Sequence, residues 1–176
     1  MDPIAEEQFS NLELNVASLP AYEEVKLHSL APNFLLKLNI GTGISMLFFF
    51  AAWITAYFFL TDYRVYLWSG AIVLLIMFSW SFYSNLQLRK RNGYALREKD
   101  VIYRRGFLFE KTTIVPFNRI QHVSVERSFL DKILNLATLK VFTAGGSGSD
   151  VSIPGLKPEN ATSLKEEISA RISGHV

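Results

Sequence analysis

The stretch that decides the fold reads LNIGTGISMLFFFAAWITAYFFLT over residues 38–61, and VYLWSGAIVLLIMFSWSFYSNLQL follows over residues 65–88. Each run holds 24 residues and no charged side chain. At about 1.5 Å per residue, a helix of that length spans roughly 36 Å, and the hydrocarbon core of a bilayer is about 30 Å thick. The two runs therefore predict two transmembrane helices, over about 38–60 and 66–88.

The alternative is a pair of buried core helices in a soluble protein. Helices that are apolar on all sides must be covered by other parts of the protein, and the roughly 90 residues that follow the second run are too few for that. The connection Asp62–Arg64 is so short that the two helices must run antiparallel. The pattern thus favours a membrane hairpin.

Small residues at helical spacing predict where the two helices pack. Antiparallel pairing places the first helix's small residues against those of the second, and close approach of two backbones requires such residues. The predicted packing residues are Gly41, Ser45, Ala56, Gly70, Ser81 and Ser84.

Charge predicts the orientation of the hairpin. Arg89, Lys90 and Arg91 follow the second run directly, Lys37 precedes the first, and the connection carries only Arg64 beside Asp62. The positive-inside rule then places both termini in the cytoplasm. Trp80, Tyr83 and Tyr94 are expected at the inner membrane interface, where aromatic side chains gather.

The two ends of the chain differ in charge. Residues 1–37 carry a net charge of −4, and residues 89–176 carry 15 basic and 9 acidic side chains, a net charge of +6. An acidic tail and a basic domain can attract each other, or the basic domain can face anionic lipid. The alternative is a mixed, solvated surface. We expect residues 1–33 to be an acidic cytoplasmic tail, forming a weak helix or remaining disordered.

After Arg91 the pattern changes to short strands. Alternating, β-branched and aromatic segments bounded by turn residues predict strands. The final helix carries an apolar face at helical spacing, which suits packing against a sheet. Strands are predicted over 94–96, 101–105, 108–115, 120–127, 139–143 and 151–154, a short helix over 129–136, a Gly/Ser loop over 144–150, and a final helix from Pro158 onward.

Two segments of this region carry a family resemblance. They read IVPFNRIQHV over residues 114–123 and LATLKVFTAGG over residues 136–146. The chain resembles the bacterial pleckstrin-homology-like domain family, and more narrowly its YdbS-type membrane proteins, over residues 34–172. Residues 127–132 read RSFLDK, where the family often has Gln-Gly-Pro-Leu followed by an Arg. The resemblance implies a bacterial or archaeal multi-pass membrane protein.

The resemblance also implies a fold and a partner. The expected domain, residues 92–173, is an α+β pleckstrin-homology-like antiparallel barrel of about seven strands, capped by the C-terminal helix. The membrane hairpin would occupy residues 34–88. Members of the family often accompany a larger relative with repeated domains of the same type, so such a relative, or a second copy of the chain, is the expected partner.

The sequence offers no catalytic or metal-binding constellation. The chain has no cysteine, which excludes disulfides, thiol catalysis and Cys-ligated metals. His28, His122 and His175 are scattered without a carboxylate at metal-ligand spacing. We therefore expect neither an enzyme nor a cofactor, and the modest charge with no aromatic-basic motif argues against nucleic-acid binding.

Two groups of residues are candidate contact sites. Exposed polar residues of the family motif and its continuation predict a protein interface, although solvation or the capping of turn carbonyls is the alternative. Basic residues at the membrane predict lipid headgroup contacts, with fixing the topology as the alternative. The interface candidates are Arg119, Gln121, Arg127 and Lys132, and the headgroup candidates are Arg89, Lys90, Arg91, Arg104 and Arg105.

Three functions compete at this point. The leading hypothesis is a noncatalytic, membrane-anchored interaction and assembly module, because both runs lack the charged groups that transport paths require. The second is a protein that binds anionic lipid or a small molecule at the inner leaflet. The third is a subunit of an enzyme or transporter whose active groups come from a partner.

Overall fold

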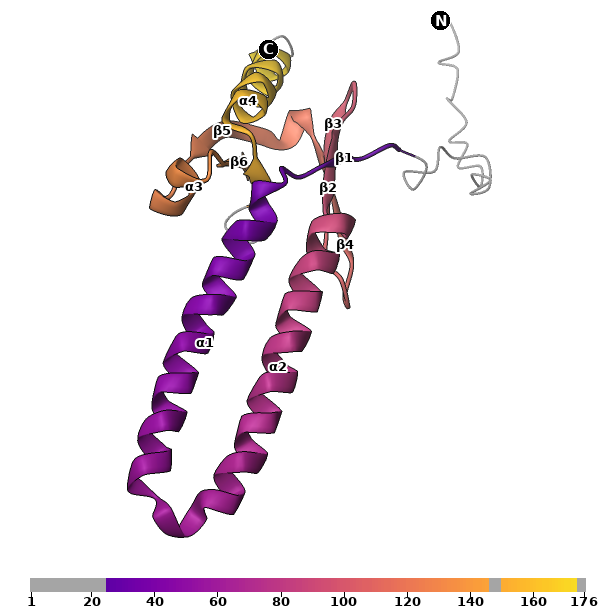
Figure 1. Ribbon diagram of the computed structural model, residues 1–176. Coiled ribbons are helices and arrows are strands. Elements are labelled where there is room, and N and C mark those ends of the chain that lie inside the picture. The colour runs from indigo at the N-terminus through magenta and orange to yellow at the C-terminus, as the bar shows by residue number, and fades with distance from the viewer. Residues whose placement is uncertain (1–24, 146–149, 174–176) are drawn as a thin grey trace, which may run out of the picture.

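The structure is a computed structural model that describes residues 25–145 and 150–173. A long helical hairpin extends from a β domain (Figure 1). The hairpin consists of α1 (Asn33–Phe59) and α2 (Arg64–Arg91), joined by a 3-10 turn at Thr61–Tyr63. Most of the expected acidic tail and most of the Gly/Ser loop lie outside the described residues.

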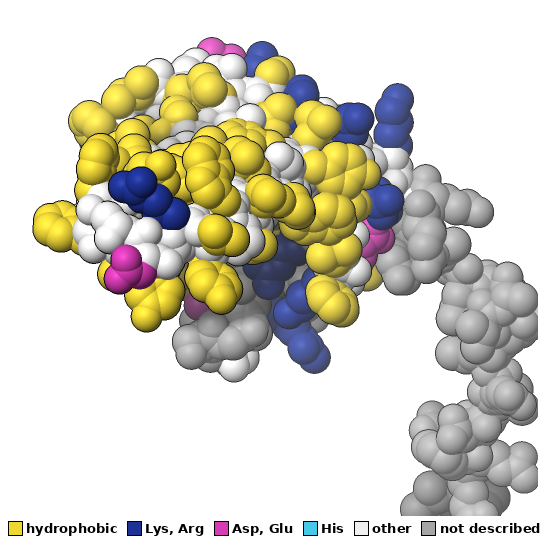
Figure 2. All heavy atoms as spheres, turned by 60° about the horizontal axis from the view of Figure 1, so that its bottom comes forward, with side chains coloured by type: hydrophobic (Ala, Val, Ile, Leu, Met, Phe, Trp, Pro, Cys, Tyr) yellow, Lys and Arg dark blue, Asp and Glu magenta, His cyan; other side chains and the backbone are white. Residues whose placement is uncertain are grey.

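Both helices are long and apolar enough to cross a membrane. Little of either helix is buried within the protein. In its most apolar stretch, 6% of α1 and 11% of the second helix are buried. Figure 2, seen towards the turn of the hairpin, shows a face covered largely by hydrophobic side chains, with Lys and Arg side chains around its margin. The alternative of two buried core helices does not fit this exposure, since a core helix is covered by protein and a spanning helix by lipid.

The two helices are joined by polar and aromatic contacts. At the end near the β domain, Asn85 Nδ2 donates to Asn39 Oδ1 at 3.2 Å and to Thr42 Oγ1 at 2.9 Å. Near the hairpin turn, Trp53 Nε1 donates to the Leu67 carbonyl at 2.8 Å. Such interhelical hydrogen bonds stabilise helix pairs in a medium without water.

The small residues are placed differently from the expectation. Gly41 and Ser45 are exposed, and Ser45 Oγ donates to the Gly41 carbonyl of its own helix. A Cβ added to Gly41 or Gly70 would have no heavy atom within 4 Å. The helix contact within the chain thus does not depend on these glycines, because the larger Trp53 and Asn85 side chains bridge the helices. The remaining predicted packing residues, Ala56, Ser81 and Ser84, are half-buried.

The β domain contains two antiparallel sheets. The first has the order β1-β2-β3-β4 and the second has the order β5-β6-β7. The first sheet consists of β1 (His28–Ser29), β2 (Gly93–Leu96), β3 (Asp100–Arg105) and β4 (Lys111–Pro116), and the second of β5 (Ile120–Glu126), β6 (Ala137–Thr143) and β7 (Val151–Leu156).

The expected closed barrel is not formed. Within residues 25–145 and 150–173, no strand pairing joins the two sheets. Between β4 and β5 the chain passes through Pro116 and a 3-10 turn at Phe117–Arg119. Proline has no N–H to continue a strand ladder, and the turn carries the chain from one sheet to the other. The domain is therefore a pair of sheets around a shared core.

Two helices, α3 and the longer α4, complete the domain. α3 (Phe129–Ile133) begins with a capping box, in which the Ser128 hydroxyl accepts from the Asp131 N–H and the Asp131 carboxylate accepts from the Ser128 N–H. α3 is shorter than the expected helix over 129–136. α4 (Pro158–Ser173) covers β5 and β6. Its Ala161 and Ile168 are fully buried.

The N-terminal segment takes part in the domain core, which the sequence pattern did not predict. Leu30 and Phe34 are buried among core residues of both sheets. The Ala31 N–H donates to the Gly155 carbonyl at 2.8 Å. Gly155 has φ +71°, and a Cβ there would lie 2.5 Å from the Phe34 ring, so only glycine fits this contact. The first turn of α1 is thus packed into the domain.

An ion pair fixes α1 to α3. Lys37 Nζ lies 2.7 Å from Asp131 Oδ1, and the Asp131 side chain is only 4% exposed. Asn33 Nδ2 donates to the Leu134 carbonyl at 3.0 Å. Burial raises the pKa of Asp131, but hydrogen bonds from Lys37 and Ser128 outweigh it, so the pKa lies below its usual value. The carboxylate therefore stays charged and holds the hairpin to the domain.

Candidate functional site

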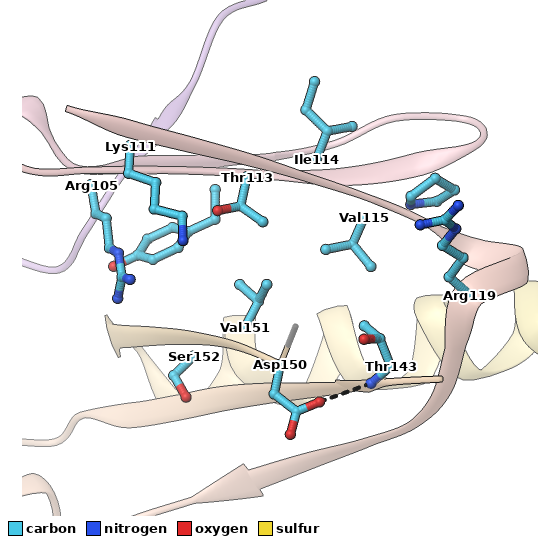
Figure 3. Close-up of a pocket in the computed structure, with 12 residues that line it drawn as sticks. Arg105, Lys111, Thr113, Ile114, Val115, Arg119, Thr143, Asp150, Val151 and Ser152 are labelled. Carbon is cyan, nitrogen blue, oxygen red and sulfur yellow. Dashed lines mark hydrogen bonds between the residues drawn. The ribbon is translucent and has the colours of Figure 1, made fainter. Parts of the chain in front are cut away.

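A cleft lies between the two sheets, where their free edges approach each other (Figure 3). Among the residues that the structure describes, β4 pairs only with β3 and β7 pairs only with β6, so each has one unpaired side. The cleft has a volume of about 240 Å³ and is open to solvent. Its floor is apolar, with Val115 from β4 and Val151 from β7. Unpaired strand edges carry N–H and C=O groups that can bind another strand.

Basic side chains surround this cleft. Arg105 and Lys111 extend from β3 and β4 into one end, and Arg119 lies at the other end (Figure 3). The acidic side chain in the lining is Asp150, and its Oδ1 accepts a hydrogen bond from the Thr143 N–H at 3.0 Å. The three cations outnumber the one carboxylate. The cleft therefore favours an anionic occupant.

The chemistry of the cleft suits binding. Tyr103 lines it, and burial raises the pKa of its hydroxyl, with Arg105 acting in the opposite direction. The phenol stays protonated and is a hydrogen-bond donor at neutral pH. Among the described residues, no group of three or more His, Asp or Glu side chains is placed to hold a metal ion.

A wider groove of about 480 Å³ lies between β2 and α4. His28, Tyr94 and Leu96 form one wall, and Asn160 and Leu164 form part of the other. Burial raises the pKa of the Tyr94 hydroxyl, although a hydrogen bond with Asn160 lowers it. Since this groove has no cluster of like charges in its lining, it offers less selectivity than the cleft between the sheets.

The family is decided by comparison with known proteins. Residues 70–172 match the family described as Bacterial PH domain. The chain belongs to the bacterial PH domain family. The match begins within α2 and ends in α4, so it covers the six strands that follow the hairpin. β1 lies outside it.

A curated relative places this PH domain in a membrane protein. The chain is 31% identical over 130 residues to the UPF0699 transmembrane protein YdbS of Bacillus subtilis (strain 168). The aligned part is 74% of this chain and 80% of that protein. No solved structure matches the chain. The PH domain and the two apolar helices thus belong to a membrane-anchored protein of YdbS type.

The predicted interface residues do not form one patch on the PH domain. Arg119 ends the 3-10 turn that precedes β5, and Gln121 lies in β5. Both are exposed, and Arg119 borders the cleft. Arg127 follows the other end of β5, where its Nε donates to the Leu136 carbonyl at 3.0 Å. Lys132 is exposed on α3. Of the four predicted residues, Arg119 alone lines the cleft.

The predicted headgroup residues divide into two sets. Arg89, Lys90 and Arg91 occupy the last turn of α2, directly beyond its apolar part. Arg104 and Arg105 are neighbours in β3, so their side chains point to opposite faces of the sheet. Arg105 lines the cleft, whereas the buried Nε of Arg104 has no hydrogen-bond partner.

Sequence reasoning missed two contacts between the hairpin and the PH domain. The pairing of Lys37 with Asp131 joins residues 94 positions apart, and no local pattern indicates it. The turn between β3 and β4 places Phe107 against α2, with ring centroids 5.8 Å from Tyr83. The available signal was an apolar Phe-Leu-Phe run after Gly106, in a position where turns are normally polar.

Proposed function

We propose that this protein is a noncatalytic, membrane-anchored interaction and assembly module. Its hairpin holds the PH domain at the cytoplasmic face of a bacterial or archaeal membrane, with both termini in the cytoplasm. The PH domain binds an extended, acidic segment of a membrane-protein partner. A larger relative with repeated PH-like domains is the partner that the family resemblance favours, and a second copy of the chain is the other.

One observation carries this proposal: β4 and β7 both have an unpaired edge on the same cleft. A peptide strand added to such an edge gains main-chain hydrogen bonds, and side-chain pockets give it specificity. The surrounding Arg105, Lys111 and Arg119 add selectivity for acidic side chains and speed their encounter with the cleft. A binding role therefore accounts for a cleft that a closed barrel would lack.

The test is co-purification of the tagged full chain from gently solubilised native membranes. The cleft variant combines Lys111→Glu with Arg119→Glu. It reverses the charge of two residues that line the cleft and are exposed to solvent. The matched control is Lys157→Glu combined with Lys165→Glu, which reverses two exposed cations outside the cleft lining. We expect a stoichiometric protein partner with the wild type and the control, and its loss with the cleft variant.

Two results would contradict the proposal. Retention of the partner by the cleft variant at wild-type stoichiometry would remove the cleft from the interaction. Recovery of the protein without any stoichiometric partner, together with a reproducible anionic lipid, would favour the second candidate function.

That second candidate is binding of anionic lipid at the inner leaflet. It rests on Arg89 and Lys90, which stand in the last turn of α2 where the apolar part of the helix ends. Each basic residue near an anionic membrane surface contributes about 1 kcal/mol of binding. Neutralising both with Gln should reduce the anionic lipid that co-purifies, and unchanged lipid content would argue that these residues only set the topology.

A further inference from the structure

The turn between β3 and β4 exposes apolar side chains. Its tip is Phe107-Leu108-Phe109, with Leu108 66% and Phe109 90% exposed. Turns of soluble proteins are rich in Gly, Pro, Asn, Asp and Ser, because these residues suit tight backbone geometry and water. Three consecutive large apolar residues at a turn tip are costly in water and require another explanation.

The tip lies beside α2. The Phe107 ring centroid is 6.4 Å from that of Trp80 and 5.8 Å from that of Tyr83. Arg91 stacks over the same Phe107 ring at 5.5 Å and forms an ion pair with Glu110 at 3.0 Å. In Figure 1 this turn reaches down along α2, from the domain towards the middle of the helix.

These contacts set the depth of the tip relative to the membrane. The uncharged part of α2 ends at Leu88, and Tyr83 and Trp80 precede Leu88 by five and eight residues. At about 1.5 Å per residue, they lie roughly 7–12 Å inside the level where the charges begin. Helical side chains also lean towards the N-terminus, which for α2 is the direction of the membrane interior. Phe107 is therefore at the depth of the apolar part of α2.

The turn is held in this position by its own structure. The Gly106 N–H donates to Asn92 Oδ1 at 2.8 Å, directly after α2 ends. Gly106 has φ +116°, and a Cβ there would lie 1.9 Å from the Phe109 carbonyl oxygen. A glycine is thus required, and the tip is directed along α2 without any other molecule.

We propose that the Phe107–Phe109 tip inserts into the cytoplasmic leaflet of the lipid bilayer. Because Phe107 touches a membrane-spanning helix inside its apolar part, the exposed Leu108 and Phe109 share that depth and contact acyl chains. Apolar groups inserted in this way typically reach about 5–10 Å into the boundary between headgroups and acyl chains. The Arg91–Glu110 ion pair then lies above the tip, in the headgroup region.

A second exposed apolar pair supports this placement on the other side of the hairpin. Phe129 and Ile133 of α3 are 77% and 63% exposed, and they lie one helical turn apart. α3 is held to the start of α1 by the Lys37–Asp131 ion pair. Since Lys37 directly precedes the first uncharged run, α3 lies at the membrane surface. The domain therefore rests on the leaflet on both sides of the hairpin.

The absence of cysteine from the chain allows a direct test. The full chain with Phe109→Cys is labelled with an environment-sensitive NBD dye and reconstituted into phosphatidylcholine–phosphatidylglycerol vesicles. Phe109 is almost fully exposed, so the label does not disturb packing. The control is Glu98→Cys. Glu98 is exposed and lies in the turn between β2 and β3, at the opposite end of β3 from the Phe107–Phe109 tip.

Compared with the dye at position 98, the dye at position 109 should show blue-shifted emission. Lipids that carry a shallow spin label should quench it several-fold more strongly. Aqueous iodide should quench the two in the reverse order. A dye at position 109 with the emission and iodide quenching of the control would overturn the proposal. So would a blue shift that disappears when the protein is diluted in excess lipid, because a second copy would then cover the tip.

Discussion

At the scale of single residues, Asp131 connects the membrane hairpin to the PH domain. Its carboxylate is almost completely buried and is bound by Lys37 and Ser128. Removing the charge leaves the ammonium group of Lys37 without its partner. We expect Asp131→Asn to lower the free energy of unfolding of the domain by about 1–3 kcal/mol. Denaturant unfolding of the protein in detergent measures this, and Glu126→Gln, in an exposed ion pair with Lys140, should cost much less.

The same carboxylate predicts a dependence of stability on pH. The pKa of Asp131 is lower in the folded protein than the usual value of 3.8 in an unfolded chain. Its contribution to stability is therefore complete above that value and is lost as the pH falls through the folded pKa. We expect the difference in stability between wild type and Asp131→Asn to shrink as the pH falls below about 4. A difference that stays constant down to pH 2 would contradict this assignment.

Gly155 is the second residue with a specific structural requirement. Its left-handed backbone and its contact with Phe34 both exclude a side chain. We expect Gly155→Ala to destabilise the domain by about 2–4 kcal/mol, from backbone strain and overpacking. Gly70→Ala is the matched control, because an added Cβ meets no atom within 4 Å. Equal melting temperatures for the two variants would show that the Phe34 contact is dispensable.

At the scale of elements, the two apolar helices are held together by Asn85 at the end near the domain. Asn85→Ala removes its hydrogen bonds to Asn39 and Thr42. We expect a loss of about 0.6–2 kcal/mol in the stability of the helix pair. Unfolding in mixed detergent micelles measures it. Thr55→Ala should have a smaller effect, since the Thr55 hydroxyl donates to the Ala51 carbonyl of its own helix.

The elements themselves were largely predictable from the sequence, because their signals are local. The uncharged runs, the alternating strand over 120–127 and the amphipathic final helix each correspond to an observed element. What failed depends on contacts between distant segments. The closed barrel is absent because the chain changes sheets at Pro116. A Cβ on Gly41 would meet no atom within 4 Å, and the Trp53 and Asn85 side chains bridge the two helices instead. Of the predicted contact residues, Arg105 and Arg119 line the cleft, but the cleft itself depends on how the two sheets approach each other and has no local signal in the sequence.

At the scale of the whole molecule, the proposed orientation can be tested directly. Asp62→Cys lies in the hairpin turn, and Glu166→Cys lies on an exposed part of α4. A membrane-impermeant maleimide should label position 62 in intact cells, and position 166 only after lysis. This expectation follows from the positive-inside rule, which assigns the basic residues after α2 to the cytoplasmic side. The reverse pattern would place the PH domain outside the cell.

The short strand β1 has a consequence for how the chain is made. β1 pairs with β2, and the whole membrane hairpin is inserted between these two neighbouring strands. Residues 30–92, which separate them, take roughly 3–13 s to synthesise at about 5–20 residues per second. Until the hairpin has folded back, β2 lacks its neighbour and the core lacks Leu30 and Phe34. We therefore expect completion of the PH domain to depend on insertion of both helices, and a chain that fails to insert to be more sensitive to proteases.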